Sequence, residues 1–524
     1  MAYITPGTIV DLMSVAMDPT YKHVRYFATN ADKNDYFDGK IVRTLTAQTY
    51  QNYTDGTIRL SVTPTQVLNC NYMRFRNIGY ENKNYYAFII STTDISNECV
   101  EINFKIDSFM TYWMDYSTPY CFIERTHTRT DDIGDNVIPE PISAEKIDKH
   151  QGINIYEYND GTYTLLTDCY YDLTNISLMT TPDQWGSATI RTINNQYALV
   201  NYSVYSTTSQ SSRDLFVAVI QDLGDAGHMD RIISCKQFPS WAYDPSELFS
   251  YIPTRDIECE CGTINNAKIG TYSVRNYKLF TSQFTSLRII ASSGETLEMK
   301  PEFCDSQNIS GAQVTYKFRE YCVLGAEPNV VVVPRGYSIN NRENRLHIGE
   351  FPDVVLTKDS WNEYLNRNGS KIALGMISSS INAMSPKANP VDIVTPGAQL
   401  LGDMIDAKNQ PASMLGTPNP SANLALGEIG WYPMLCQVRA VDAQKIDEFF
   451  DMYGYAINNI GLPTRKIRNK YTYIKTQGLQ VNGNIPVEAV TEISNAYNNG
   501  VTFWADNANF MNYALAIRQA NSLH

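Results

Sequence analysis

The side chains with which this chain could bind a metal or catalyse a hydrolysis are its histidines, its cysteines and its clustered carboxylates. The six histidines show no HExxH spacing, which would place two zinc ligands and a general base on one helix face. The Cys259–Cys261 pair lacks the second pair of ligands that a structural zinc site needs. Asp131, Asp132 and Asp135 do not follow the EF-hand order of ligands, so we predict a solvated turn there.

Motifs that bind phosphates and nucleotides are absent as well. The chain has neither a GxxxxGK[ST] loop nor a GxGxxG turn after a strand. The acidic stretch of Asn30, Asp32, Asn34, Asp35 and Asp38 predicts only a polar loop. The carboxylate pair of a glycoside hydrolase is recognised by its spacing in three dimensions, so the sequence leaves that chemistry open. We expect no catalytic residue, no metal and no cofactor.

Composition narrows the class of protein. At 524 residues with a net charge of −13, the chain is long enough for about three domains and is too acidic for tight, lasting binding of nucleic acid. The 36 tyrosines favour pleated, half-buried surfaces. Ten scattered cysteines predict free, mostly buried thiols in a reduced cytoplasm. We find no N-terminal signal peptide and no run of eighteen strongly apolar residues, so we expect no constitutive transmembrane helix.

The pattern over residues 1–355 is mainly that of β-strands. In residues 1–145 a hairpin turn is predicted at Asp55-Gly56 and one helical turn at Asp107–Trp113, capped by Asp107. In residues 146–355 the dipeptide Asp160-Gly161 lies between two strand-like runs and predicts a hairpin, and Pro334 is expected to stop the last strand. The other predicted strands are Tyr72–Phe75, Tyr85–Ile90, Val100–Phe104, Cys121–Arg125, Ala198–Tyr205, Leu215–Ile220, Leu287–Ala291, Leu297–Phe303 and Val330–Val333.

Residues 431–524 read as a mixed α+β part. Ala443–Tyr453 predicts an amphipathic helix with Phe449 and Phe450 on its apolar face. Pro486–Tyr497 predicts a second helix, and Val501–Trp504 a buried strand. Asn482-Gly483 predicts another hairpin turn.

The segment between these parts, residues 356–430, has the most unusual composition. Its Lys371–Gly430 window contains no aromatic residue, no Arg and no His, and its prolines block any long helix. Short apolar helical patches remain, and a connection of this length in a compact domain is uncommon without a function or disorder. It reads either as a surface loop or as an apolar insertion that meets a membrane or blocks a channel. The candidate functional residues are its apolar ones: Leu374, Met376, Ile377, Ile381, Met384, Leu400, Leu401, Met404, Ile405, Met414, Leu415, Leu424 and Leu426.

Several stretches, in the same order along most of the chain, resemble one protein family. They are YYAFII, INFKIDSFMTYWMDY, FIERTHTRTDDIGDNVIPEPI, RNYKLFTSQFTSLRII, FPDVVLTKDSWNEYLNRN, KIDEFFDMYGYAINNI, YTYIKTQGLQVNGNIP and NNGVTFW. As a set they are similar to the tail knob (distal tail tube) proteins of small short-tailed, picovirus-type phages of Gram-positive bacteria.

This resemblance implies a fold and a function. The expected fold is mainly β with a smaller α+β C-terminal part, in which β-barrel tube domains assemble as a homohexameric ring around a DNA channel. The expected function is that of a virion structural protein, made in the host cytoplasm, which conducts DNA during ejection. Its expected partners are the lower collar or proximal tail tube, the tail tip, the genomic DNA in the lumen and the host membrane. The insertion, residues 356–430, stands where the family carries a long loop that plugs the tube mouth and is thought to pierce the membrane, and its Ser, Asn and Pro content favours plugging.

Two other functions stay open at this point. A cell-wall hydrolase of the tail tip would need convergent carboxylates or a Cys/His pair in a pocket. A receptor-binding adhesin could use the tyrosine-rich β surfaces.

Overall fold

The structure is a computed structural model, and it divides into two compact units. Unit 1 combines Met1–Ser143, Val274–Leu279 and Val441–His524, whereas unit 2 combines Ala144–Ser273 and Phe280–Ala440. The four-part division predicted from the sequence stays a prediction. The residues that the structure describes are 7–48, 56–77, 83–149, 153–182, 190–193, 196–243, 252–305, 308–310, 313–338, 345–349, 351 and 429–514.

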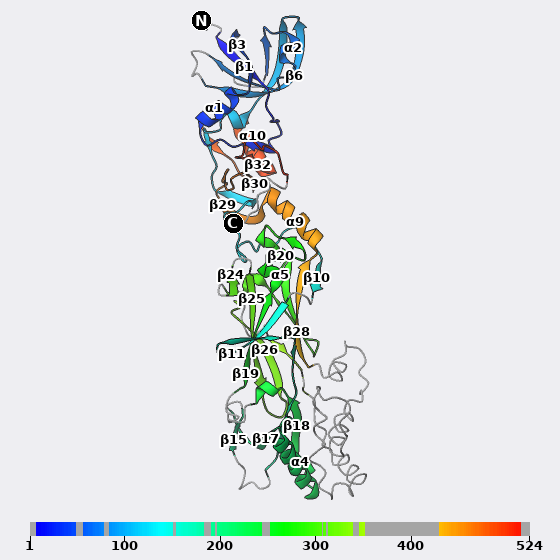
Figure 1. The fold of residues 1–524 in the computed structure, drawn as a ribbon. Coiled ribbons are helices and arrows are strands. Elements are labelled where there is room, and N and C mark those ends of the chain that lie inside the picture. The colour runs from blue at the N-terminus through cyan, green and yellow to red at the C-terminus, as the bar shows by residue number, and fades with distance from the viewer. Residues whose placement is uncertain are drawn as a thin grey trace, which may run out of the picture. The chain divides into compact units, whose positions relative to one another are not determined.

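Unit 1 begins with a six-stranded antiparallel sheet in the order β3-β1-β5-β6-β7-β4 (Figure 1). Its apolar face, with Val10, Leu60, Phe75 and Ile102, forms one buried cluster. The strands are β1 (Thr8–Met13), β3 (Ile41–Gln48), β4 (Gly56–Leu60), β5 (Tyr72–Asn77), β6 (Tyr85–Ser96) and β7 (Cys99–Ile106).

A five-stranded sheet in unit 1 joins the two ends of the chain. Its order is β2-β32-β30-β9-β29, and β2 runs parallel to β32. Trp113, Tyr497 and Phe503 belong to the buried aromatic cluster of this region. The strands are β2 (His23–Arg25), β9 (Cys121–Thr126), β29 (Tyr455–Gly461), β30 (Tyr471–Gln477) and β32 (Val501–Trp504). The helices of unit 1 are α1 (Asn30–Asp38), α2 (Pro64–Val67), α3 (Ser108–Thr111), α9 (Ala440–Tyr453) and α10 (Val487–Asn499).

Unit 2 is built on two larger sheets. One has the order β10-β28-β22-β23, with β13 also paired to β28, and the other has the order β12-β11-β19-β25-β26-β27 with β24 beside β25. The strands of the first sheet are β10 (Lys146–Lys149), β13 (Cys169–Tyr170), β22 (Thr285–Ala291), β23 (Thr296–Met299) and β28 (Gly430–Val438). Those of the second are β11 (Ile153–Asn159), β12 (Thr162–Leu166), β19 (Thr254–Cys261), β24 (Ile309–Ser310), β25 (Gln313–Val323), β26 (Asn329–Arg335) and β27 (Leu346–His347).

A third, three-stranded sheet of unit 2 has the order β17-β14-β18 and packs on the helix α4. These elements are β14 (Asn175–Thr180), β17 (Asn201–Ser206), α4 (Gln210–Asp225) and β18 (Ile232–Phe238). Smaller elements complete the unit: the hairpins β15 (Ile190–Ile193) with β16 (Gln196–Leu199) and β20 (Lys268–Ile269) with β21 (Tyr272–Ser273), and the short helix α5 (Gly262–Asn265). In the described part of the chain no helix is long and apolar enough to cross a membrane.

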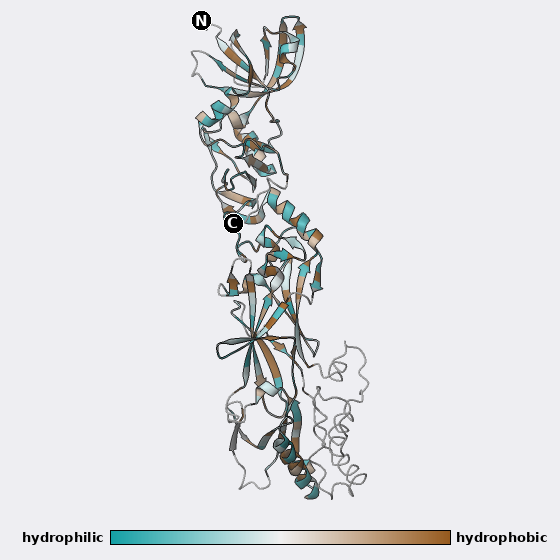
Figure 2. Cartoon of the chain, viewed as in Figure 1, coloured by the Kyte–Doolittle hydropathy of each residue, from teal (hydrophilic) through white to brown (hydrophobic). Residues whose placement is uncertain are grey.

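The strand predicted at Leu215–Ile220 is wrong, because these residues lie inside α4. The side chain of Ser209 caps the helix, and Phe216 and Ile220, four residues apart, are buried against β14 and β18. Leu215 is 61% exposed, as the helical period requires. Figure 2 shows hydrophilic and hydrophobic residues alternating along this helix.

Three shorter predictions also fail. The predicted polar loop at residues 30–38 is the helix α1, which Thr29 and Asp32 begin with a capping box. Asn482-Gly483 is no hairpin turn but the short strand β31, which pairs with β8 (Tyr116–Ser117). Pro334 does not stop its strand, since β26 continues to Arg335.

The mainly β class predicted from the sequence is confirmed, but the expected closed barrel is not found among the described residues. Closure of the N-terminal sheet would require β3 to pair with β4, and its strand order leaves these two at opposite ends. The burial pattern explains the open edge: Leu45 is the only buried side chain of the eight in β3. A strand inside a closed barrel would bury every second residue.

Candidate functional site: the base of the insertion

The thirteen apolar residues predicted to act in the insertion lie between residues 352 and 428, outside the described part of the chain. The structure describes the residues on either side of them, all in unit 2. We call residues 345–349 with Phe351 the N-terminal stem and residues 429–431 the C-terminal stem. These stems determine where the insertion leaves and re-enters the fold.

The N-terminal stem continues the seven-stranded sheet. Its strand β27 pairs with β26, and the amide of Ile348 donates to the carbonyl of Val330 at 3.0 Å. Gly349 has a φ of +109°, which an L side chain rarely adopts. Phe351 then turns back into the fold and is only 2% exposed. The chain therefore enters the insertion from a fixed, buried residue.

The C-terminal stem enters the other sheet. The carbonyl of Ile429 accepts a hydrogen bond from the amide of Tyr171 at 2.8 Å. Gly430 lies so close to β13 that an added Cβ would stand 2.2 Å from the carbonyl oxygen of Cys169, so only glycine fits. Trp431 is fully buried, and its ring lies 5.3 Å from that of Phe318.

One serine joins the two stems. The hydroxyl of Ser292 donates to the carbonyl of Ile348 in the N-terminal stem and accepts from the amide of Gly430 in the C-terminal stem, both at 3.3 Å. Ser292 belongs to the turn between β22 and β23. Since one side chain reaches both, the two ends of the insertion leave the fold side by side.

A buried carboxylate binds two residues at the base of the insertion. Glu320 on β25 is fully buried, and its Oε1 accepts from the Tyr171 hydroxyl at 2.8 Å and from the Trp431 indole at 2.6 Å. Its Oε2 accepts from Nε of Arg255 at 2.6 Å. Burial, together with the charge of Glu320, raises the pKa of Tyr171 well above its usual value, so the hydroxyl stays protonated and can donate.

These groups position backbone and do not form a reactive centre. Both oxygens of Glu320 accept hydrogen bonds from protein donors, one of them a guanidinium, and the side chain has no exposed surface on which a substrate could reach it. The ring of Phe351 packs beside that of Tyr171, with 6.3 Å between centroids. Tyr171 thus touches a residue of each stem and the carboxylate beneath them. The arrangement can hold the base of a long insertion in place.

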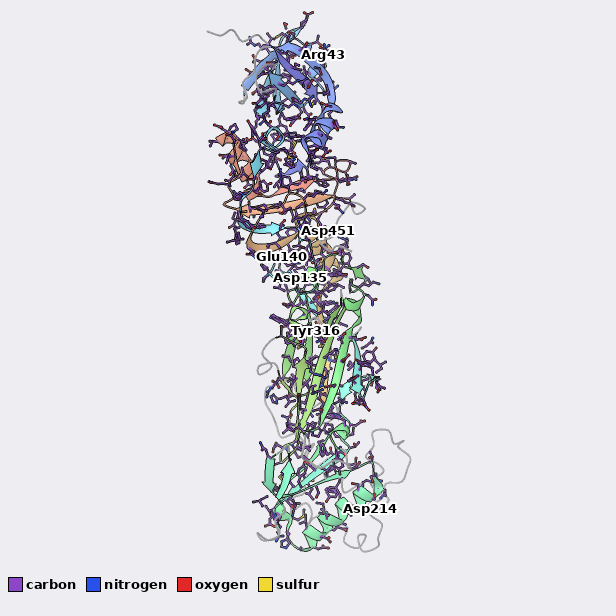
Figure 3. The ribbon with its side chains drawn as sticks, turned by 90° about the vertical axis from the view of Figure 1, so that its left-hand side faces the viewer. Arg43, Asp135, Glu140, Asp214, Tyr316 and Asp451 are labelled. Atoms are coloured by element: carbon purple, nitrogen blue, oxygen red, sulfur yellow. The ribbon has the colours of Figure 1, made fainter. Side chains whose placement is uncertain are left out.

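Sequence reasoning missed a second buried network, in unit 1, around the short segment Val274–Leu279. Asp447 accepts from the backbone amides of Arg275 and Asn276 at 2.9 and 3.0 Å, and Asp451 accepts from Nε of Arg275 at 3.0 Å. Both aspartates have no exposed surface (Asp451 is labelled in Figure 3). Their i, i+4 spacing beside Ile446 and Phe450 was the available signal.

The solvated turn predicted for Asp131, Asp132 and Asp135 is found at Asp132 and Asp135, which are exposed, but the prediction is wrong for Asp131. Asp131 is buried and accepts from the Tyr277 amide and the Tyr455 hydroxyl, both at 2.8 Å. Burial raises its pKa to about 7. Glu140, labelled in Figure 3, accepts from Lys278 at 2.5 Å and also pairs with Arg125. These carboxylates fasten the segment 274–279 within unit 1.

The prediction that the cysteines are free and mostly buried is confirmed. All ten cysteines are free, and eight of them are buried. Burial raises the pKa of Cys259 well above its usual value, which keeps the thiol protonated and unreactive. Among the described residues no group of three or more His, Cys, Asp or Glu side chains is placed to hold a metal ion.

Two family models match this chain, one in its C-terminal half and one at its N-terminus. A family model described as "Bacillus phage phi29, Tail knob protein gp9, C-terminal domain" matches residues 254–405 and 375–516, which together span half of the chain. A second, described as "Caudoviral major tail protein N-terminus", matches residues 6–117.

Individual relatives cover nearly the full length. Tail knob protein gp9 of Bacillus phage B103 is 22% identical over 96% of this chain and 98% of its own. The gp9 of Bacillus phage phi29 is 21% identical over 98% and 99%. The solved tail knob protein gp12 of bacteriophage C1 has a TM-score of 0.59 at 12% identity, over 97% of this chain and 98% of that chain, which shows a common fold. The chain therefore belongs to the tail knob protein family and is a structural protein of a phage tail.

Proposed function

We propose that six copies of this protein assemble head-to-tail into a ring at the distal end of a short tail, and that the channel of this ring conducts the genome during ejection. A ring of identical chains uses one repeated interface and presents each insertion six times around one axis. The ring would adjoin the lower collar or proximal tail tube on one side and the tail tip on the other. Synthesis in the host cytoplasm fits the ten free thiols.

The insertion, residues 356–430, is proposed to plug the mouth of the channel and to enter the host membrane on release. The observation that carries this proposal is the pair of stems joined by Ser292. Since Ile348 and Gly430 meet at one hydroxyl, the two stems are held at one point, and a displacement of the chain between them would not require a strand of either sheet to move. The closure entropy of a loop grows only logarithmically with length, so such a long excursion costs little.

The channel wall is proposed to be acidic or neutral. The chain has 55 acidic residues and 42 basic ones, and a conduit must not hold phosphates by releasing counterions. A continuous stripe of Lys and Arg along the channel of the assembled ring would contradict this.

The experiment that tests the ring is native mass measurement on the purified protein and on tails released from particles. We expect a species of six chains. A strictly monomeric protein at high concentration, together with a single copy per tail, would overturn the proposal. Clearing of host cell walls by the same preparation would instead support a hydrolase, and binding of monomers to intact cells an adhesin.

A further inference from the structure

Among the strands that the structure describes, β12 is an edge of the seven-stranded sheet in unit 2, and no other strand covers it. It consists of five uncharged residues, TYTLL, and lies at the end of the strand order, next to β11 alone. Four of the five are exposed, with Tyr163 at 57% and Leu165 at 63%. Strands rich in tyrosine, threonine and leucine with both faces in solvent are unusual at a sheet edge.

The hairpin geometry determines which backbone groups are free to pair. Asp160 and Gly161 form the turn with φ of 45° and 87°, and Asn159 pairs with Thr162 directly beside it. In a two-residue hairpin this flanking pair exchanges hydrogen bonds, and the pattern then alternates. The amides and carbonyls of Thr162 and Thr164 therefore point toward β11, whereas those of Tyr163 and Leu165 point outward.

The two edges of this sheet differ. At the opposite edge, β26 contains Pro334, which has no amide to donate, and is partly covered by the two-residue strand β27. β12 has no proline, no charge and no bulge in its pairing with β11. One edge is thus closed to further strands, while the other carries none of the features that block them.

Apolar side chains accompany the open edge. Tyr163 packs on Tyr158 with 4.9 Å between ring centroids and on Tyr156 with 6.4 Å. Leu165 stands opposite Tyr156 on the same face. The next strand inward, β19, carries acidic residues that are paired across the sheet, such as Asp256 with Arg319 at 2.6 Å. Within β11 and β12, the face that carries Tyr163 and Leu165 has no charged side chain, whereas Glu157 of β11 lies opposite Thr164 on the other face.

We propose that a strand from a second copy of this chain adds to β12 in the assembled protein. Copies that each carry a net charge of −13 repel one another, and an uncharged strand lets two of them meet without placing like charges together. In an assembly of identical chains every copy has its edge covered at once. At the far edge the two-residue strand β27 and Pro334 of β26 disfavour a further strand, so growth of the sheet in that direction is disfavoured. This inference rests on the proposed ring.

The test is Leu165→Pro with Leu165→Ala as its matched control. Proline removes the outward amide of residue 165 and leaves the bonds of Thr162 and Thr164 to β11 intact. Alanine removes the side chain and keeps the amide. We expect Leu165→Pro to lose the assembly, with native mass falling while circular dichroism is unchanged, and Leu165→Ala to retain it. An undiminished native mass for Leu165→Pro would overturn the inference.

Amide hydrogen exchange in the wild-type protein gives a second readout that does not depend on a variant folding. If β12 is covered, the amides of Tyr163 and Leu165 exchange as slowly as those of Thr162 and Thr164, which bond to β11. Fast exchange at Tyr163 and Leu165 in an intact oligomer would refute the edge contact and leave the ring standing. A wild-type protein that is only monomeric would refute both.

Discussion

Ser292 and Gly430 bind each other in both directions. The amide of Ser292 donates to the carbonyl of Gly430 at 2.9 Å, and the amide of Gly430 donates to the hydroxyl of Ser292 at 3.3 Å. This reciprocal pair secures the point where the insertion returns to the sheet.

Ser292→Ala should loosen this point without unfolding the protein. It leaves the amide of Gly430 and the carbonyl of Ile348 without their partner, at a cost of about 1–3 kcal/mol for buried groups. Hydrogen exchange at Gly430 should become faster. Ser293→Ala is the control, because the hydroxyl of the exposed Ser293 donates to the carbonyl of His347 and accepts from the amide of Glu295, so it holds neither Ile348 nor Gly430. Equal effects of the two substitutions would contradict the role given to Ser292.

Phe450→Ala should destabilise unit 1 far more than Phe449→Ala. The sequence placed both rings on the buried face of one helix, but only Phe450 is fully buried, 5.0 Å from the ring of Tyr455. Its loss should cost about 3–5 kcal/mol. Phe449 is half-buried beside Tyr453 and Arg125, so we expect about 1 kcal/mol. Chemical unfolding of both variants checks the order, and the reverse ranking would show that the helix is turned differently.

Asp131 should make the stability of unit 1 depend on pH. Its pKa is raised from 3.8 to about 7 by burial, so its contribution is fully present below about pH 4 and is lost as the pH rises through about 7. In Asp131→Asn the side chain has no carboxyl group to titrate, so this pH dependence disappears. Relative to wild type, the variant should gain up to about 4 kcal/mol in unfolding free energy between pH 4 and pH 8.

Urea unfolding at the two pH values measures this gain. Asp132→Asn removes a negative charge from the same turn at an exposed position and serves as the control. If both variants respond to pH alike, burial of Asp131 is not the cause.

Replacing both Ile377 and Ile381 by Asp should impair the function of the insertion without changing the fold of the two units. The sequence predicts that these residues share the apolar face of a short helix. We expect normal folding and assembly, with impaired genome delivery and impaired leakage from liposomes. An unfolded double variant would place the segment in a core. Unchanged delivery would make it an ordinary surface loop.

Turns and helix caps could be predicted from the sequence where adjacent residues decide the backbone conformation. Asp160-Gly161 forms the expected turn, and Asp107 caps α3 by accepting from the amide of Met110 at 3.0 Å. The dipeptide Asn482-Gly483 has the same turn chemistry, yet it pairs as a strand with Tyr116–Ser117. A partner more than 300 residues away decides that outcome, and no short-range signal reports it.

The buried charges could not be predicted for a related reason. Asp447 and Asp451 are polar in any hydropathy scale, and their burial is compensated by hydrogen bonds from Arg275 and Asn276, which come from a distant part of the chain. The stems show the same limit. In the sequence Trp431 is simply the first aromatic residue after the Lys371–Gly430 window, whereas its hydrogen bond to Glu320 depends on strand order.

The parallel pairing of β2 with β32 has a consequence for synthesis on the ribosome. His23 lies beside Thr502, so the first strand of this sheet waits for almost the whole chain to be translated before its neighbour exists. In the sequence, the residues of unit 2 come between these two strands, so the sheets of unit 2 can form while β2 still has no partner. The aromatic cluster of unit 1 therefore stays incomplete until the end of translation. During that interval the exposed aromatic residues would most need a chaperone.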